Sequence, residues 1–283
     1  MKRELVLQSL ICLLVMSCSV HEPDISQADM VYYVTLESYA DPGTRVYVDE
    51  KVKLHWEADD RFSLFRSTLN EQWRFTGNTG DDAGEITSAS TQFGTGADID
   101  FRCAVYPYQS STKIDNKNNV LKLTLPEKQT YREGSFGRGA NMMVSVTEEN
   151  DNLLNFKNIG GYMVFNFYGD GVSVSSIRIE GRNGEFLSGE ATLAASIGDI
   201  PKIVMASTAG TSITLSCDDI ALDASEEKAT EFWMVVPPTT FTKGFKLTVT
   251  GADGKEFVRE SDKELSVVRN TVLRVAPLEL SFD

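Results

Sequence analysis

The chain of 283 residues contains two histidines, which is too few for most histidine-based chemistry. His21 and His55 have no second histidine or cysteine nearby at the spacing of a zinc site. A serine triad would have to use His55, and the sequence has no Gly-x-Ser-x-Gly elbow. It also has no Walker loop and no GxGxxG after a strand. Carboxylates are abundant, but nothing marks two of them as a glycosidase pair. We therefore expect a protein that is not an enzyme and binds no cofactor or metal.

Cysteine is too sparse for a disulfide framework. Cys12 and Cys18 lie in the N-terminal segment, and Cys103 and Cys217 lie far apart in strand-like runs. The last two are expected to be buried free thiols that pack as small apolar groups.

Basic residues are outnumbered, with 27 Lys and Arg against 41 Asp and Glu, which gives a net charge of −14. Such a balance argues against nucleic acid and against an anionic membrane face as partners. Asp81, Asp82 and Glu85 lack the spacing of an EF-hand, so a solvated acidic loop is expected there.

A long hydrophobic run is also missing, because the apolar segment Leu5–Met16 is too short to span a bilayer. With Lys2 and Arg3 before it, this segment is typical of a secretory signal peptide. It ends in "VMSC", which resembles a bacterial lipobox with Cys18 as the lipidated first residue of the mature chain. The alternative is a general secretory signal that is cleaved elsewhere. We expect a signal peptide at 1–17, a polar tether at 18–29 and attachment to the outer membrane through lipid on Cys18.

Clean helical periodicity is absent, and alternation of apolar and polar residues dominates instead. It predicts strands at five places: 52–56, 121–125, 176–180, 212–216 and 245–250. Segment 152–161 is expected to form one short helical turn at most. Asn183-Gly184 and Asp253-Gly254 are typical of tight hairpins. The aromatic runs 162–168 and 232–236 could form sugar-binding platforms, but their alternation fits core strands better. The pattern predicts an all-β fold of antiparallel sandwiches.

The polar segment 148–152 is the best linker candidate. We therefore predict two tandem antiparallel β-sandwich domains, at 30–150 and 151–283. Segment 76–98, rich in Gly, Asp, Thr and Ser, is expected to be a long loop or a pair of irregular edge strands.

Several segments in this order resemble the fimbrillin-like (FimA/Mfa-type) lipoproteins of Bacteroidetes, a family of fimbrial and cell-adhesion proteins. The resemblance covers essentially the whole mature chain. Its segments are "TRVYVDEKVKLHWEADDRFSLF" (44–65), "WRFTGNTGDDAG" (73–84), "AVYPY" (104–108), "LTLPEKQTY" (123–131), "LNFKNIGGYMVFNFYG" (154–169), "FWMVVPPTTFTKGFKLTV" (232–249) and "RNTVLRVAPLEL" (269–280).

The resemblance implies two transthyretin-like domains and export as a lipoprotein. It also implies that stalk members are cut after an arginine near the first strands. The cut removes an N-terminal strand, and a strand of another subunit fills the groove. Arg45, after the turn Asp41-Pro42-Gly43, fits the cleaved position, and segment 30–39 would be the removable strand. Arg61 and Arg66 are alternatives.

The expected function is thus a fimbrial subunit or adhesin at the cell surface, with other fimbrial subunits as partners. The alternative is an uncleaved monomeric outer-membrane lipoprotein that binds a glycan or a host protein.

Overall fold

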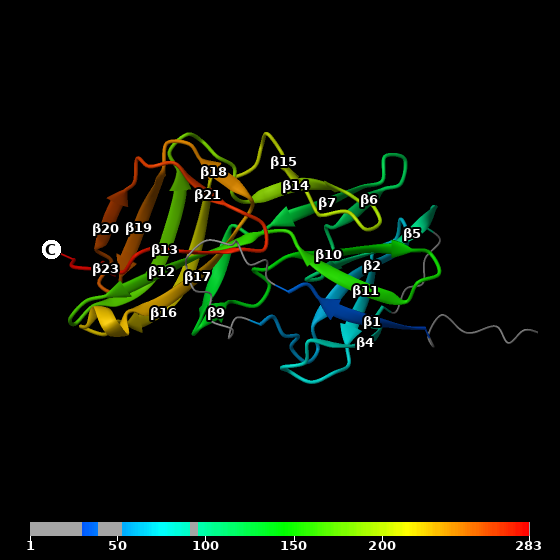
Figure 1. The fold of residues 1–283 in the computed structure, drawn as a ribbon, viewed down its shortest axis with the longest axis horizontal. Coiled ribbons are helices and arrows are strands. Elements are labelled where there is room, and N and C mark those ends of the chain that lie inside the picture. The colour runs from blue at the N-terminus through cyan, green and yellow to red at the C-terminus, as the bar shows by residue number, and fades with distance from the viewer. Residues whose placement is uncertain (1–29, 39–52, 91–95, 283) are drawn as a thin grey trace, which may run out of the picture.

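The computed structural model describes residues 30–38, 53–90 and 96–282. These residues form two lobes made of β-strands, and the helical element among them is the 3₁₀ turn η2 (Glu226–Lys228) (Figure 1). Within the described part of the chain, no helix has the length and apolar character needed to cross a bilayer. The predicted all-β fold class is confirmed.

The described residues of the first lobe, on the right in Figure 1, form a closed barrel. Its strands, in spatial order, are β1 (Val31–Leu36), β11 (Leu153–Asn158), β10 (Met143–Glu148), β5 (Asp98–Tyr106), β2 (Arg61–Ser67), β3 (Glu71–Phe75) and β4 (Ala83–Ser88). Aromatic rings fill its interior. Trp56 is central to them, with ring centroids 5.1–6.1 Å from those of Phe62, Phe75, Tyr106 and Phe156.

A second sheet packs on the outer face of this barrel. It consists of β15 (Ile203–Met205), β14 (Gly189–Ala194), β7 (Val120–Leu125) and β6 (Lys113–Asp115). Leu121 and Leu123 of β7 share a buried cluster with Cys103 of β5 and Val144 of β10. The barrel strands are therefore buried on both faces in this region.

The second lobe, on the left in Figure 1, is a sandwich of two sheets. The large sheet contains β20 (Glu256–Glu260), β19 (Phe245–Gly251), β13 (Ser173–Gly181), β16 (Ser212–Ala221), β8 (Lys128–Arg132) and β9 (Ser135–Phe136). The small sheet contains β17 (Thr230–Val236), β12 (Gly161–Tyr168), β22 (Val272–Arg274) and β23 (Leu278–Glu279), and a separate pair is formed by β18 (Thr239–Phe241) and β21 (Leu265–Val267). Phe165 of β12, Ile177 of β13 and Leu247 of β19 meet in the core between the sheets.

Three of the sheets formed by the described residues combine strands from both sides of residue 150. Strand β11 completes the barrel, β14 pairs with β7, and β8 pairs in parallel with β16. Of the segment 148–152, Glu148 is the last residue of β10, and 149–152 connect it to its paired neighbour β11. The division into domains at residue 150 stays a prediction. Strand β11, after residue 150, belongs to the sheet of the first lobe, and strand β8, before it, belongs to a sheet of the second lobe.

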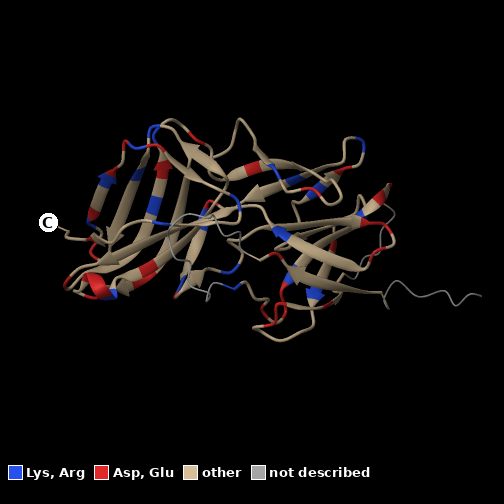
Figure 2. Cartoon of the chain, viewed as in Figure 1, with Lys and Arg blue, Asp and Glu red and all other residues tan. Residues whose placement is uncertain are grey.

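The predicted strands at 121–125, 176–180, 212–216 and 245–250 are confirmed as parts of β7, β13, β16 and β19. The aromatic runs 162–168 and 232–236 are core strands, as expected, because they lie within β12 and β17 and most of their side chains are buried. The Asp253-Gly254 hairpin joins the paired strands β19 and β20, with Gly254 at φ +81°. In Figure 2, acidic and basic residues are interspersed over strands and loops of both lobes, so the net negative charge is distributed.

The helical turn expected at 152–161 is wrong. Leu154 and Phe156 of β11 point into the barrel, and the neighbours β1 and β10 supply the backbone hydrogen bonds of an extended strand. Asn183-Gly184 is a turn, but the strands that flank it, β13 and β14, belong to different sheets, so it closes no hairpin.

The strand expected at 52–56 is also wrong over its described residues, 53–56, although the burial of Trp56 and the exposure of His55 follow the predicted alternation. The backbone of Trp56 forms hydrogen bonds with the backbone of Gly80 and Asp81, in a turn, instead of with a strand. Within 76–98, expected to be a loop or irregular edge strands, β4 is an internal barrel strand between β1 and β3.

Candidate functional site

Strand β1 is an integral part of the barrel and is the candidate for the removable strand predicted at 30–39. It pairs antiparallel with β4 over Val31–Thr35 and in parallel with β11 over Tyr33–Leu36. Tyr32 and Val34 are fully buried, whereas Tyr33 between them is half exposed. The Tyr32 ring meets Trp73 edge to face, with centroids 5.1 Å apart. The strand thus closes the barrel by backbone pairing on both edges and by filling two interior positions.

The end of β1 is fastened to the C-terminal part of the chain. Glu37 accepts two hydrogen bonds from Arg269, at 2.6 and 2.8 Å, in a bidentate ion pair. The side chains of Arg269 and Glu37 keep only 15% and 24% of their exposure. Arg269 also donates to the Asn158 carbonyl at 2.9 Å, and the Asn158 amide donates to Glu37 at 3.0 Å. This contact joins residues that are 232 positions apart in sequence.

Three buried asparagines continue this contact into the interior. Asn141 donates to Asn158 at 2.7 Å, Asn158 donates to Asn270 at 2.6 Å, and Asn270 donates to the Ser38 carbonyl at 2.7 Å. Tyr162 adds a hydrogen bond to Asn141 at 3.2 Å. Asn270 has φ +58°, a conformation that asparagine tolerates better than most residues. A satisfied buried polar network of this kind fixes the geometry of the groups that it joins.

Removal of β1 would have clear chemical consequences. The edges of β4 and β11 that now pair with it would be left with unpaired N–H and C=O groups. The positions of Tyr32 and Val34 would become apolar pockets that alternate with exposed positions. A new extended segment could pair with the free backbone groups through hydrogen bonds and fill the apolar pockets with alternating side chains. The arrangement is thus suited to binding a strand.

Of the three candidate arginines, two lie in β2. Arg61 is the first residue of that strand and is paired with Arg74 in the barrel register. Arg66 lies inside it and forms an ion pair with Glu71 at 2.8 Å, in which the two side chains are only 10% and 6% exposed. A protease would have to unfold β2 to reach Arg66. Arg45 and Cys18 lie outside the described residues.

A cleft of about 540 Å³ lies between the lobes. Its barrel side carries Glu57, which forms ion pairs with Arg132 and Arg138. Arg138 also donates to the buried carboxylate of Asp60 at 2.9 Å. Burial raises the pKa of Asp60, although hydrogen bonds from the Glu57 amide and Arg138 act in the opposite direction. Burial likewise raises the pKa of Tyr106, which donates to Asp60 at 3.1 Å.

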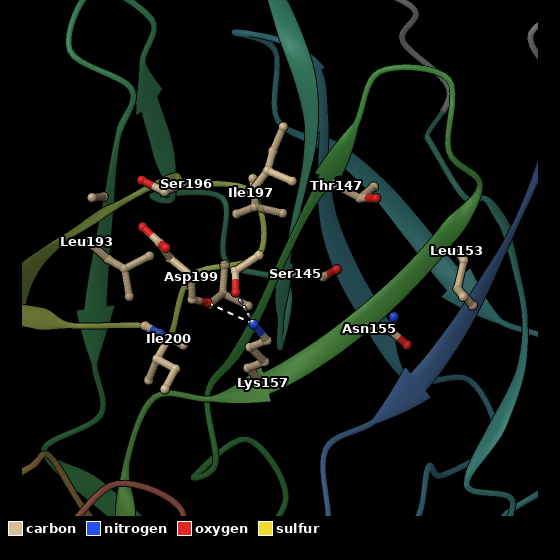
Figure 3. Close-up of a pocket in the computed structure, with 15 residues that line it drawn as sticks. Ser145, Thr147, Leu153, Asn155, Lys157, Leu193, Ser196, Ile197, Asp199 and Ile200 are labelled. Atoms are coloured by element: carbon tan, nitrogen blue, oxygen red, sulfur yellow. Dashed lines mark hydrogen bonds between the residues drawn. The ribbon is translucent and has the colours of Figure 1, made fainter.

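A smaller cavity of about 220 Å³ lies on the outer face of β10 and β11, under the segment that joins β14 to β15 (Figure 3). Lys157 of β11 donates to the carbonyls of Gly198 and Asp199, both at 2.9 Å. Ile197 and Ile200 on this segment are exposed, as is Leu153 at the far end of the cavity. Because its amino group is already bound to two carbonyls, Lys157 holds the segment in place.

The remaining predicted residues take structural positions. His55 is exposed at the cleft between the lobes, and Cys103 and Cys217 are buried free thiols, as expected. In the described ranges, no group of three or more His, Cys, Asp or Glu could hold a metal ion. Sequence reasoning missed Glu37, Arg269 and the buried asparagines, because nothing in the sequence links positions so far apart.

No protein-family model matches the chain, and no curated protein is similar to it in sequence. Among solved structures it is similar to a protein from Bacteroides ovatus described as a "putative cell adhesion protein". The two are 13% identical, the match covers 88% of this chain and 91% of the other, and the TM-score is 0.50. A protein from Bacteroides uniformis with the same description is 16% identical over 78% of this chain and 88% of the other, with a TM-score of 0.47. The tip fimbrial protein Mfa3 from Porphyromonas gingivalis, truncated at its C-terminus, is 10% identical over 87% and 94%, with a TM-score of 0.28. At these identities the likeness to the first of these proteins establishes a shared fold.

Proposed function

We propose that the chain is a non-enzymatic fimbrial subunit or surface adhesin, exported as a lipoprotein through Cys18. In its polymerising form it is cut after Arg45, which releases β1, and a strand of another subunit takes the vacated place. The order of segments that resembles fimbrillin-like lipoproteins supports this function, as does the fold shared with the cell-adhesion protein from Bacteroides ovatus.

The observation that carries the proposal is the position of β1. It is paired along both edges and buries Tyr32 and Val34, so its loss leaves a groove that matches an extended strand. Repeated head-to-tail addition of such strands gives an open filament.

The test is N-terminal sequencing of the protein isolated from its own cells, with Arg45→Lys as the variant. An arginine-specific protease rejects lysine, although the charge is unchanged. We expect the native protein to begin at Val46 and to form polymers, and the variant to begin at Cys18 and stay monomeric. Arg61→Lys is the matched control and should be processed normally. A native protein that begins at Cys18 and occurs only as a monomer would contradict the proposal that the chain is cut and polymerises.

The second candidate function is an uncleaved monomeric outer-membrane lipoprotein that binds a glycan or a host protein. The bidentate contact between Glu37 and Arg269 favours it, because this contact stabilises the state in which β1 is retained. A clear hit on a glycan array with the uncut protein would support this function. If array binding is absent and polymers form, the candidate fails.

A further inference from the structure

The cleft between the lobes differs from the groove of β1 in its chemistry, because charged side chains in pairs line much of it. Glu57, on the barrel side, pairs with Arg138 and with Arg132 of the sandwich strand β8. On the sandwich side Glu231 accepts from Arg274 at 2.5 Å and from the Trp233 indole at 3.0 Å. The Arg274 guanidinium also lies over the Trp233 ring, 5.4 Å from its centroid.

These pairs fix the positions of hydrogen-bonding groups while cancelling their charge. Glu57 and Glu231 already have arginine partners, so a charged ligand that bound to either pair would have to break an ion pair in order to form its own. Lys53 and Glu133, one of each sign, also line the cleft and together add no net charge. A neutral ligand with hydroxyl groups can instead donate to the carboxylates and accept from the guanidinium groups without disturbing either pair. The balance of charge therefore favours a neutral, polyhydroxylated ligand.

The cleft also offers an apolar surface and a glycine-rich wall. The ring of Phe136 stacks on Tyr162 with centroids 5.4 Å apart and planes at 15°. It is held in a segment where Gly134 and Gly139 have φ values of +66° and +81°. A Cβ at either glycine would meet no atom within 4 Å, so there is open space beside this backbone. Phe136 can therefore present an apolar face to the C–H side of a sugar ring, while the ion pairs contact its hydroxyls.

We propose that this cleft is a binding site for a neutral saccharide. Its volume of about 540 Å³ lies within the usual range of small-ligand sites, about 300–1,000 Å³. The proposal rests on the second candidate function, the binding of a glycan, for which it specifies the site and the class of ligand. It is independent of the fimbrial function, since it needs neither cleavage nor assembly.

The test is binding of the unlipidated mature chain to an array of neutral and acidic oligosaccharides, followed by calorimetry on the best ligand. Ser135→Trp places a large side chain beside Arg132, its cross-strand partner, which pairs with Glu57 in the cleft, and should weaken binding at least tenfold. The matched control, Lys117→Trp, adds the same ring on the exposed β6–β7 turn outside the cleft and should bind as the native chain does.

Circular dichroism and the unfolding midpoint establish whether each variant is folded. If Ser135→Trp does not fold, Arg132→Ala, whose side chain is half exposed, takes its place with the same expected direction. Binding of neutral saccharides that the cleft variant abolishes and the control retains supports the site. Absence of any saccharide binding, binding of acidic saccharides only, or binding that is equal in the folded cleft variant overturns it.

Discussion

Replacement of Arg269 by alanine tests whether the C-terminal part of the chain holds β1 in place. The substitution removes both hydrogen bonds to Glu37 and the one to the Asn158 carbonyl. An exposed ion pair is worth about 0–1 kcal/mol, and breaking a fully buried one costs about 3–5 kcal/mol. Because the two side chains keep 15% and 24% of their exposure, we expect Arg269→Ala to lower the free energy of unfolding by ~2–3 kcal/mol.

The effect should also be local. Strand β22 begins three residues after Arg269, pairs with β12 over only three positions and lies at the edge of its sheet. When the chain loses the anchor that Arg269 forms at the end of β1, amide hydrogen exchange should accelerate over 272–280. Urea unfolding measures the global change, and hydrogen exchange followed by mass spectrometry locates it.

The matched control is Arg74→Ala, which breaks an ion pair with Asp59 whose side chains are 47% and 65% exposed. It should lower stability by no more than about 0.5 kcal/mol. A double-mutant cycle with Glu37→Ala should give a coupling energy of about 1–3 kcal/mol. If Arg269→Ala is no more destabilising than Arg74→Ala, or exchange over 272–280 is unchanged, the contact does not fasten β1.

Three further predictions concern single side chains. Tyr32→Ala should lower the free energy of unfolding by about 3–4 kcal/mol, because the ring is buried against Trp73. The neighbouring Tyr33→Ala should lower it by less than about 1 kcal/mol. Equal losses of unfolding free energy in urea would contradict the orientation of β1. Because burial raises the pKa of Asp60 in the folded state, its contribution is full below about pH 4 and is lost as the pH rises through the raised pKa. The free energy of unfolding of the native protein, relative to that of Asp60→Asn, should thus fall as the pH rises above about 4. If this difference increases with pH, the pKa of Asp60 is not raised in the folded state. Burial raises the pKa of Cys217 to about 12 and that of Cys103 further, so iodoacetamide should label neither thiol until urea unfolds the chain, and labelling of the folded chain would show that they are accessible.

Strands that carry their own alternation were predictable from sequence. In β7, Leu121, Leu123 and Leu125 all face the core, and the pattern alone locates the strand. In β4 only Ile86 is buried, so the sequence of that strand resembles a loop. Its place in the barrel comes from β1 and β3, which supply backbone hydrogen bonds on both of its edges. Pairing of this kind depends on the neighbours rather than on the segment itself.

The contacts across residue 150 and the candidate sites were not predictable for the same reason. Glu37 and Arg269 are ordinary surface residue types, and only the folded chain brings them together. The ion pairs of the cleft likewise join Glu57 to Arg132, and Glu231 to Arg274, from separate elements. By contrast, the resemblance to fimbrillin-like lipoproteins indicated segment 30–39 as the strand that would be removed, with the turn Asp41-Pro42-Gly43 after it.

The connectivity of the barrel makes β1 different from the other six strands. The other six barrel strands, β2 to β5, β10 and β11, all lie within 61–158. A cut between any two of them would therefore leave barrel strands on both sides of the cut. A cut between residues 38 and 61 separates β1 alone, because β1 precedes all the others in sequence. Its neighbours keep their second partners, since β4 remains paired with β3 and β11 with β10. One cut followed by dissociation of β1 would therefore convert a closed barrel into an open sheet of six strands with two free edges. Among the candidate arginines, Arg45 is the one whose cleavage gives this product without dividing β2.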